Sequence, residues 1–370
     1  MRVVIKKSAI LNGIKFCNNM IGQNIIYPIL QSILIEIKNN SIFLTSSNGI
    51  SSSIYKISEG IQIFEEGTVL IKARTLLNII SKLDDEDVLL EKMDNSLLKI
   101  KSGRFDSNIN IMNVEEYPNL KFDNSGWDTI AMSPKQLFEI NKKVSPSVNT
   151  NVEKESVFNG ILIDSETENH MLRTIASDTF KLSLIKYHFN GSKFKMIIEP
   201  SIIKNILEIA NNSEIHFFKR DSKIIIKFNN VIISTKNIEG NFPSIDKIIN
   251  QDYVSNLKID KYKLQNVLNR GLSLIINDNK PIANFRISRN DILISFKSNE
   301  IGSASETIEI ESNNIDRIDF DINISYLISL LKPFEKNEIT IHISDINKPL
   351  MFKDETDVKF TQILVPLRKN

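Results

Sequence analysis

The chain has 370 residues, of which 41% are hydrophobic and 25% are charged, and its formal net charge is +1. A chain of this length exceeds one ordinary hydrophobic core, so two or three domains are expected, while the small net charge neither favours nor excludes a nucleic-acid partner. No apolar run reaches membrane-spanning length, the N-terminal segment lacks the core and cleavage site of a signal peptide, and the single cysteine, Cys17, excludes an internal disulfide. These features predict a cytoplasmic protein without a membrane partner.

Two kinds of amphipathic segment recur along the chain, and each kind occurs three times. The first kind spans residues 7–20, 133–143 and 260–272, and the second spans residues 71–83, 198–210 and 322–334. In every copy the spacing of the apolar residues predicts one buried stripe of a helix. Ser133, followed by Pro134, and Asp260 are typical helix N-caps. Corresponding positions lie 124 to 127 residues apart, which is the size of a whole domain.

Alternating strands are predicted between these helices. Residues 32–37 and 41–45 form a predicted hairpin around Asn39 and Asn40, because asparagine tolerates the positive φ of a tight turn. A similar hairpin is expected at 285–288 and 292–296, and further alternating runs occur at 97–101, 108–112, 224–228, 231–235, 339–343 and 359–364. We therefore expect an α+β fold of three tandem domains, 1–127, 128–252 and 253–370, in each of which two helices pack on antiparallel sheets.

The six helical segments carry a surplus of positive charge. Their thirteen basic residues are Lys7, Lys15, Lys72, Arg74, Lys82, Lys135, Lys142, Lys143, Lys204, Lys261, Lys263, Arg270 and Lys332, against four acidic residues, Glu139, Glu199, Glu208 and Asp260. Lysine is also common on solvated helix faces, so the charge of any single helix is weak evidence for a surface that binds a polyanion. A surplus shared by six related helices indicates a helix-lined surface that faces a polyanion.

The size of a ring lined by such helices decides how many chains it needs. Neighbouring helices lie about 10 Å apart, so six helices give about 19 Å between opposite axes, which is too little for a duplex. Twelve helices give about 38 Å between opposite axes and a hole of about 28 Å. Two chains of three repeats could therefore close around DNA, and a head-to-tail homodimer would satisfy the symmetry preference of oligomers.

The common motifs of catalysis are missing from the sequence. It contains no GxxxxGK[ST] phosphate loop, no GxGxxG fingerprint and no paired Cys/His metal spacing, and its histidines at 170, 188, 216 and 342 are scattered. A Ser-x-x-Lys pattern occurs at 201–204 and 255–258, but such short matches arise by chance and no Lys-Thr-Gly accompanies them. We therefore expect a non-enzymatic protein with no cofactor and no metal.

Short segments spread over nearly the whole chain carry a resemblance to a known family. They are Tyr27-Pro28-Ile29-Leu30, Lys72-Ala73-Arg74, Ser102-Gly103-Arg104, Tyr117-Pro118-Asn119-Leu120, Phe158-Asn159-Gly160, residues 176–182, Gly240-Asn241-Phe242-Pro243 and residues 363–368. With these segments the chain resembles the bacterial DNA polymerase III beta subunits, the sliding clamps. The resemblance implies three DNA-clamp domains per chain and a homodimeric ring that encircles duplex DNA and tethers the replicative polymerase for processivity.

The resemblance also implies partners and a site that binds their peptides. The expected partners are the DNA polymerase III alpha subunit, the ATP-dependent clamp loader, repair polymerases, mismatch-repair proteins and ligase. The implied peptide-binding residues are Phe158, Ser177, Thr179, Phe180, Lys181, Leu182, Pro243, Lys247, Ile248, Ile363, Val365, Pro366, Leu367 and Arg368. Phe180 and Lys181 stand where the family usually has His and Arg, so the site should be more apolar and should lose planar bidentate donation.

For DNA binding, the resemblance matches Lys72 and Arg74 to a basic pair on the family's inner rim. Asn24 and Val157 occupy positions where some members have an arginine and a tyrosine that contact DNA. The helical surplus adds further candidates, Lys82, Lys142, Lys143 and Lys204. An alternative function is a non-enzymatic regulator that binds duplex DNA through one basic helical face, with steep salt dependence and direct binding to short linear DNA.

Overall fold

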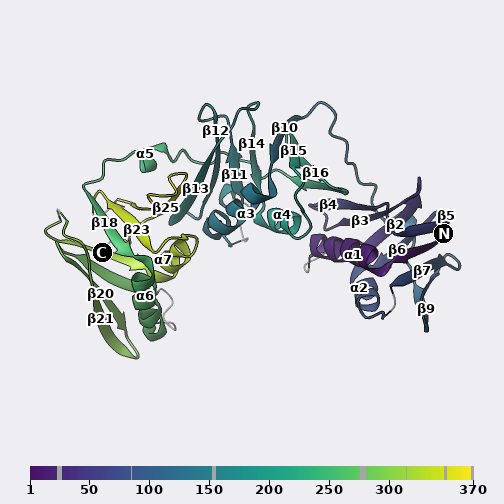
Figure 1. The fold of residues 1–370 in the computed structure, drawn as a ribbon, viewed down its shortest axis with the longest axis horizontal. Helices are drawn as coiled ribbons and strands as arrows, with labels where there is room; N and C mark the ends of the chain where they lie inside the picture. Colours follow the sequence, from purple (N-terminus) through teal and green to yellow (C-terminus); the bar gives the residue numbers. More distant parts are fainter. Residues whose placement is uncertain are drawn as a thin grey trace. The chain divides into compact units, whose positions relative to one another are not determined.

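The computed structural model describes residues 1–22, 27–84, 86–151, 156–275, 281–313, 315–345 and 348–367. The chain forms two compact units. The first unit contains Met1–Leu137 and Ser201–Asn237, and the second contains Phe138–Pro200 and Ile238–Asn370. Two helices, α3 (Pro134–Lys143) and α4 (Pro200–Leu207), run across the division between the units. The fold is mixed α+β, and its sheets are antiparallel throughout the described residues (Figure 1).

The first unit is built on two sheets. The larger has eight strands in the spatial order β10 (Asp128–Met132), β15 (Ile215–Arg220), β16 (Lys223–Phe228), β17 (Val231–Lys236), β4 (Ser52–Ile57), β3 (Ser41–Ser47), β2 (Ser32–Lys38) and β6 (Gly67–Lys72). The smaller has five strands in the order β5 (Ile61–Glu65), β1 (Arg2–Lys6), β7 (Asp87–Lys92), β8 (Leu97–Ser102) and β9 (Phe105–Asn110).

Two helices of the first unit, α1 (Lys7–Ile21) and α2 (Ala73–Ser81), pack against each other, and α1 also contacts β3 and β4. Their apolar stripes are fully buried at Ile14, Leu76 and Ile80. Burying a side chain of this size stabilises the fold by about 1.5–3 kcal/mol. The stripe predicted from the spacing of apolar residues is therefore the surface that holds these helices on the core.

The second unit repeats this plan. Its eight-stranded sheet has the order β14 (Lys195–Ile198), β11 (Ile161–Asp164), β12 (Met171–Ser177), β13 (Lys181–His188), β25 (Phe360–Leu364), β24 (Leu350–Lys353), β23 (Glu338–Ile343) and β18 (Ser255–Asp260). Its four-stranded sheet has the order β21 (Gly302–Glu309), β20 (Asp291–Ser298), β19 (Ile282–Ile287) and β22 (Ile318–Asn323). Its helices are α5 (Asp246–Ile249), α6 (Lys261–Ile275) and α7 (Ile324–Leu331), with short 3-10 turns at Ser145–Ser147 and Val157–Asn159.

Each eight-stranded sheet is continuous between two sequence repeats. In the first unit β17 pairs with β4, with Val231 opposite Tyr55. In the second unit β13 pairs with β25, with Lys181 opposite Leu364. The middle repeat therefore contributes strands to both compact units. The domain boundaries expected near 127 and 252 remain predictions, and β10 and β18 begin close to them.

All six predicted helices are present as α1, α3, α6, α2, α4 and α7. The second-kind helices α2, α4 and α7 begin two residues later than predicted. The preceding strand runs up to the helix in α2 and α7, and Glu199 alone lies between β14 and α4, which begins at Pro200. Both predicted N-caps are confirmed: the Ser133 hydroxyl accepts from the Gln136 N–H at 3.2 Å, and the Asp260 carboxylate accepts from the Lys263 N–H at 2.8 Å. The hairpin turn is also confirmed, with φ of 49° at Asn39 and 53° at Asn40.

The sequence did not predict the five- and six-residue strands β1, β10 and β18, which lead directly or almost directly into the first-kind helices. Where a short strand runs directly into a helix, the alternating apolar pattern of the strand merges with the 3.6-residue pattern of the helix. The strand is then hard to recognise from the sequence, which explains the omission. The four-residue helix α5 was also missed, and it lies just before the domain boundary expected near residue 252.

Candidate functional site

A tight turn between β12 and β13 carries several of the predicted site residues. The Ser177 hydroxyl donates to the Lys181 carbonyl oxygen at 2.8 Å. The Asp178 carboxylate accepts the backbone N–H groups of Phe180 at 3.0 Å and of Lys181 at 2.8 Å. Thr179 has a φ of 77°, which is strained for a β-branched residue. The turn is thus held by its own polar groups, and it leaves the Phe180 ring 46% exposed.

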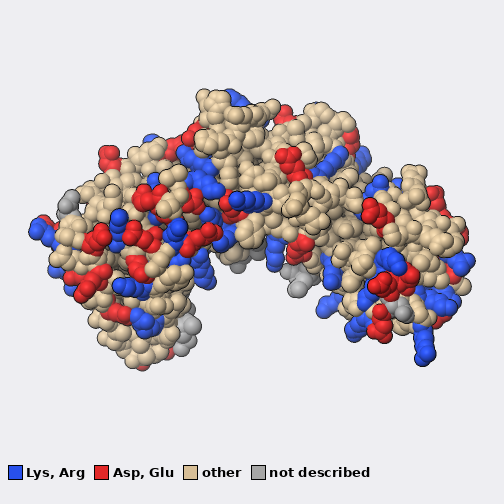
Figure 2. All heavy atoms as spheres, viewed as in Figure 1, with Lys and Arg blue, Asp and Glu red and all other residues tan. Residues whose placement is uncertain are grey.

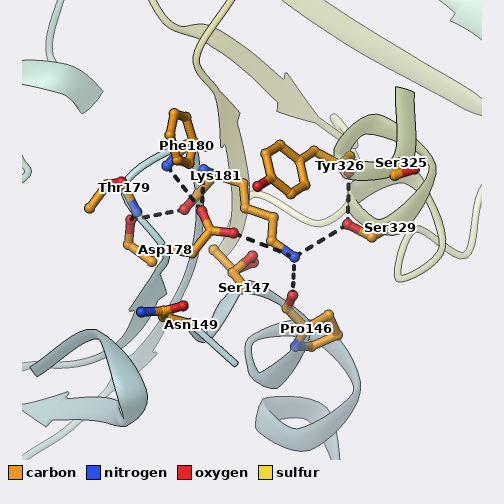
Figure 3. A network of polar contacts seen from close by, with 12 residues as sticks. Pro146, Ser147, Asn149, Asp178, Thr179, Phe180, Lys181, Ser325, Tyr326 and Ser329 are labelled. Atoms are coloured by element: carbon orange, nitrogen blue, oxygen red, sulfur yellow. Dashed lines mark hydrogen bonds and ion pairs between the residues drawn. The ribbon is translucent and has the colours of Figure 1, made fainter. Parts of the chain in front are cut away.

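Lys181 points away from solvent and joins three segments of the second unit (Figure 3). Its ammonium donates to the Pro146 carbonyl oxygen and lies 3.4 Å from the Ser329 hydroxyl of α7. The Asp178 carboxylate is 3.9 Å away. Burial lowers the pKa of Lys181, and the Asp178 charge offsets only part of that effect. The ammonium therefore serves internal contacts.

An aromatic pair, Phe180 and Tyr326, lies beside this lysine. The two rings are stacked, with centroids 5.8 Å apart and planes inclined by 24°. The Lys181 ammonium is 5.7 Å from the Tyr326 ring centroid, within the range of a cation–π contact. Tyr326 thus contacts both consecutive residues of the turn, and α7 is held against it.

An apolar cluster lies in the same unit. Its buried members are Leu162, Ile175, Leu182, Leu184, Ile197, Phe242, Ile245, Met351 and Ile363, and its partly buried members are Val157, Phe158, Ile238, Ile248, Ile249 and Tyr253. Phe158 meets Phe242 edge to face, with ring centroids 5.5 Å apart. The partly buried members give the cluster an accessible rim, which suits the apolar side chains of a partner.

Helix α5, which contributes Ile248 and Ile249 to the cluster, is fixed by an ion pair. The Arg173 guanidinium on β12 is almost fully buried and lies 3.1 Å from the Asp246 carboxylate at the start of α5. Within the described residues the Nε of Arg173 has no hydrogen-bond partner. Because this pair ties α5 to the sheet, it sets the position of one side of the apolar cluster.

The structure brings most of the predicted peptide-binding residues into these two features. Phe158, Leu182, Ile248 and Ile363 belong to the apolar cluster, and Ser177, Thr179, Phe180 and Lys181 form the turn. Val365 bonds to the turn through its backbone, and Pro366 and Leu367 follow it. Pro243 is exposed just before α5, Lys247 is exposed on α5 itself, and Arg368 lies outside the described residues.

Two residues of this region were not predicted from the sequence. Tyr326 was absent from the predicted set although it stacks on Phe180, and Arg173 was absent although it holds α5. A signal for Tyr326 was present, because it is an aromatic residue beside the apolar stripe of a repeated helix. Arg173 had no such signal, since a basic residue in an alternating strand normally faces solvent.

The predicted DNA-binding residues differ in their environments. Lys72, Arg74, Lys82 and Lys204 are exposed, whereas Lys142 pairs with Glu335 at 2.8 Å and Asn24 lies outside the described residues. Lys143 is buried, 2.6 Å from the Asp357 carboxylate and 5.1 Å from the Phe360 ring centroid. Val157 packs on the apolar cluster. On the face in Figure 2, basic side chains are interspersed with acidic ones.

The described residues offer no cluster of side chains typical of a metal centre. They contain no group of three or more His, Cys, Asp or Glu side chains that could hold a metal ion. None of the described helices is long and apolar enough to span a membrane. A cavity of about 300 Å³ lies near the end of α3, but its walls include Lys143 paired with Asp357 and Lys359 paired with Glu139. Those charged groups in the cavity wall are therefore already paired with each other.

Comparison with known families matches three consecutive stretches of the chain. Residues 1–121 match the N-terminal domain of the DNA polymerase III beta subunit, residues 131–244 match its central domain, and residues 246–368 match its C-terminal domain. Together the three matches leave only short stretches of the chain uncovered.

Whole-length relatives agree with these matches. The chain is 25% identical to the beta sliding clamp of Mycoplasma genitalium over 382 aligned residues, covering 100% of both chains. It is 26% identical to that of Staphylococcus aureus, covering 100% of this chain and 99% of the relative. Among solved structures, the beta subunits of Streptococcus pneumoniae and Streptococcus pyogenes align over 100% of both chains, with TM-scores of 0.93 and 0.92 at 22% and 21% identity.

Proposed function

The chain belongs to the DNA polymerase III beta subunit family, and from this premise we propose how it assembles and holds its partners. It is a sliding clamp of DNA polymerase III, a non-catalytic processivity factor. Membership implies DNA, a polymerase and other clamp-binding proteins as partners, and a dimeric ring. Because such a protein works on DNA inside the cell, the cytoplasm is its proposed location.

The observation that carries the proposal is the threefold recurrence along the chain of two kinds of helix, first α1 and α2, then α3 and α4, then α6 and α7. In two chains this repeat supplies twelve helices, the number that the spacing of about 10 Å requires for a hole wide enough for a duplex. The proposed domains are 1–127, 128–252 and 253–370. A closed head-to-tail homodimer then encircles duplex DNA.

We propose that the dimer contact uses two edge strands. In the described residues β9 is bonded only to β8, and β21 only to β20, so each presents a row of unpaired backbone groups. Head-to-tail association would pair β9 of one protomer with β21 of the next, which removes both edges. Phe105, 41% exposed on β9, would be covered by that contact.

A matched pair of substitutions tests this contact. F105E places a charge on the β9 edge, whereas F64E places one on β5, at the opposite edge of the same sheet, where Phe64 is 54% exposed. Sedimentation is expected to give monomers for F105E and dimers for F64E. Dimers in both variants, or monomers in both, would remove β9 from the interface.

We propose that partner proteins dock short peptides on the apolar cluster and the aromatic pair. The aliphatic and aromatic rim around Phe158 and Ile248 suits the anchoring side chains of a peptide, and the tail from Val365 provides an adjoining backbone. The proposed users of this site are the polymerase alpha subunit, the clamp loader, repair polymerases, mismatch-repair proteins and ligase. Titration of the protein with peptides from such partners is the direct test.

We propose that the exposed cations of the helices, Lys72, Arg74, Lys82 and Lys204, supply the weak, sequence-independent contacts to DNA. Lys142 is a weaker candidate for contact with DNA because it already pairs with Glu335. Lys143 is no longer a candidate because it is buried and paired with Asp357. A sliding ring should bind phosphates loosely, since strong contacts would stop its movement.

Retention on DNA tests encirclement itself. Loaded on a nicked circle with a clamp loader and ATP, the protein is expected to remain bound, and cutting the circle is expected to release it. The competing regulator with one basic face would bind short linear DNA directly and stay on both forms. Family membership does not favour this regulator, whereas equal retention on circular and cut DNA would support it over encirclement.

A further inference from the structure

The first unit contains a turn built like the turn between β12 and β13. It connects β3 to β4, and the side-chain oxygen of Asn48 accepts the backbone N–H groups of Ile50 at 3.0 Å and of Ser51 at 2.7 Å. Asp178 accepts the corresponding two N–H groups in the second unit. Gly49 has a φ of 92°, and its counterpart in the second unit has a φ of 77°. The same set of contacts therefore holds Ile50 in a turn, where it is 66% exposed.

An apolar cluster lies beside this turn, and we call it the first-unit cluster. Its buried members are Leu30, Leu70 and Tyr117, and its partly buried members are Ile29, Leu34, Met112, Val114 and Leu120. Leu30 lies next to the turn, because a Cβ built on Gly49 would be 3.6 Å from its Cδ1 atom. The partly buried members give the first-unit cluster an accessible rim, as they do in the second unit.

Strand pairing shows that the two clusters occupy the same place in their repeats. Leu34 lies opposite Leu70 in the pair of β2 with β6. Leu162 lies opposite Ile197 in the pair of β11 with β14. In each unit a later segment donates one backbone hydrogen bond to this edge strand, at 2.8 Å from Met112 to Leu70 and at 3.0 Å in the second unit. The first unit therefore carries a structural counterpart of the proposed peptide site.

The first-unit cluster is smaller and more polar than its counterpart. In the second unit Leu182 lies opposite Ile363, and both belong to the apolar cluster. The corresponding opposed residues of the first unit are Ser52 and Ser234. Because this side of the surface is polar, an occupant with a single apolar anchor suits it better than one with several.

Tyr117 provides a second observation that points to an occupant. Within the described residues its hydroxyl has no hydrogen-bond partner, although the residue is only 8% exposed. Burial raises the pKa of Tyr117, so the hydroxyl stays protonated and can donate. A buried donor without a partner is destabilising, and a peptide carbonyl oxygen would satisfy it. The rim member Met112 has an unbranched, adaptable side chain that can move to admit such a group.

Charges of both signs flank Tyr117 along the chain. Glu115 and Glu116 directly precede it in the 3-10 turn Val114–Glu116, and both are exposed. Lys121 follows the last residue of the first-unit cluster, and its carbonyl oxygen accepts from the Lys223 ammonium at 2.7 Å. A peptide with a basic residue on one side of its anchor and an acidic residue on the other complements both pairs.

We propose that the first-unit cluster is a second peptide-docking surface, which binds an extended segment with one apolar anchor between a basic and an acidic residue, and that the Tyr117 hydroxyl donates to the backbone of that segment. This inference goes beyond the proposed function, because it concerns another surface and another class of peptide. It uses the proposed peptide site of the second unit only as a structural parallel.

The test uses the full-length protein and a synthetic probe, Lys-Lys-Gly-X-Gly-Glu-Glu, in which X is a leucine analogue with a photoreactive diazirine. After irradiation, mass spectrometry maps the labelled segments. Labelling is expected within residues 27–34 and 112–120. A probe in which glutamate replaces both lysines should label these residues at least about fivefold less, because Glu115 and Glu116 would repel it.

Two pairs of variants test the residues of the surface. I50S is expected to reduce first-unit labelling by at least about threefold through lost apolar contact, whereas V358S, at an exposed valine elsewhere, should leave it unchanged. E115Q/E116Q should reduce labelling by the mixed probe and not by the all-glutamate probe. E59Q/E214Q makes the same change in net charge at other exposed acidic residues of the first unit and should have no effect.

Y117F separates binding from packing. The variant removes the unpaired hydroxyl, so the free protein is expected to unfold at a higher urea concentration than wild type. First-unit labelling is nevertheless expected to fall by about threefold to tenfold, because the peptide loses a donor. Unchanged labelling in Y117F would overturn the role of the hydroxyl, since a purely structural role predicts only the change in stability.

The outcomes separate this inference from the proposed function. Absence of labelling at 27–34 and 112–120 contradicts the inference, whatever is labelled in the second unit. Labelling there that survives both I50S and E115Q/E116Q also contradicts it. Labelling around Phe158 and Ile363 reports on the proposed peptide site of the second unit and leaves the inference unaffected. Urea unfolding verifies that each variant is folded under the labelling conditions.

Discussion

The backbone N–H of Val365 donates a hydrogen bond of 2.8 Å to the carbonyl oxygen of Phe180. This bond continues the pairing of β13 with β25 one step past the opposed residues Lys181 and Leu364. The C-terminal tail and the turn that carries the aromatic pair are therefore one structural piece. Substitutions or deletions in the tail should therefore alter the conformation of the turn.

Removal of residues 365–370 is expected to abolish peptide binding and to leave dimerisation intact. The deletion removes the Val365 contact and the side chains that follow it, whereas the edge strands β9 and β21 lie elsewhere in the chain. Peptide titration and sedimentation measure the two properties. An unchanged peptide affinity would exclude the tail from the site. V358A, at an 83% exposed valine, is the control.

The buried pair Lys143–Asp357 should matter far more for stability than the exposed pair Lys142–Glu335. The side chains of the first pair are 7% and 22% exposed, and those of the second are 41% and 67% exposed. K143M leaves a carboxylate without its partner and is expected to lower the free energy of unfolding by about 3 kcal/mol. K142M should cost at most about 1 kcal/mol. Urea unfolding compares them, and equal losses would contradict the assignment.

The protein should lose stability below neutral pH through His342. Burial, together with the charge of Lys353, lowers the pKa of this imidazole below its ordinary 6.5, although Glu355 acts in the opposite direction. The unfolded chain then binds the proton more readily, so the contribution of His342 is complete above pH 6.5 and is lost as pH falls through the folded pKa. Urea midpoints measured from about pH 8 to about pH 5 should fall less in H342Q than in wild type. Parallel curves would contradict this.

Gly271 permits the close approach of α6 to β20. A Cβ at this position would lie 2.0 Å from the ring of Phe296, which is buried. G271A is therefore expected to lower the free energy of unfolding by about 1–3 kcal/mol through overpacking. The double variant G271A/F296L should recover part of that loss, because the smaller side chain vacates the space. If G271A unfolds at the wild-type urea concentration, the helix can move away without cost.

Reversing the charges of Lys72 and Arg74 should weaken the contact with DNA. Both side chains are exposed at the start of α2. Binding of K72E/R74E to duplex DNA at low salt should be weaker, and the slope of log affinity against log salt should be shallower by about 2. K121E/K193E carries the same change in net charge at other exposed lysines. An identical loss in both variants would point to bulk charge rather than to α2.

The sequence predicted the repeated helices because each carries its own local pattern. The buried stripe at Leu76, Ile203 and Leu327 follows directly from apolar spacing, and the Asn39-Asn40 turn follows from the tolerance of asparagine for positive φ. Such features depend on neighbours in the chain, so they can be read without a structure.

The features that sequence reasoning missed depend on distant partners. Lys143 was predicted to be a DNA-binding residue, but it is buried and pairs with Asp357 at 2.6 Å across 214 positions of sequence. Tyr326 was overlooked because its partner Phe180 is on another repeat. Most of the peptide-site residues came from the family resemblance, since composition and periodicity alone do not distinguish an accessible apolar rim from an ordinary core.

The pairing of β17 with β4 makes adjoining repeats structurally interdependent. A fragment ending near residue 127 would keep β4 but lose its partner strand β17. The row of backbone donors and acceptors exposed on β4 would then favour self-association. The same holds for β25 without β13. No single repeat can therefore be separated from its neighbour without exposing strand edges, so any opening of the assembly for DNA entry is best placed between subunits, not within one.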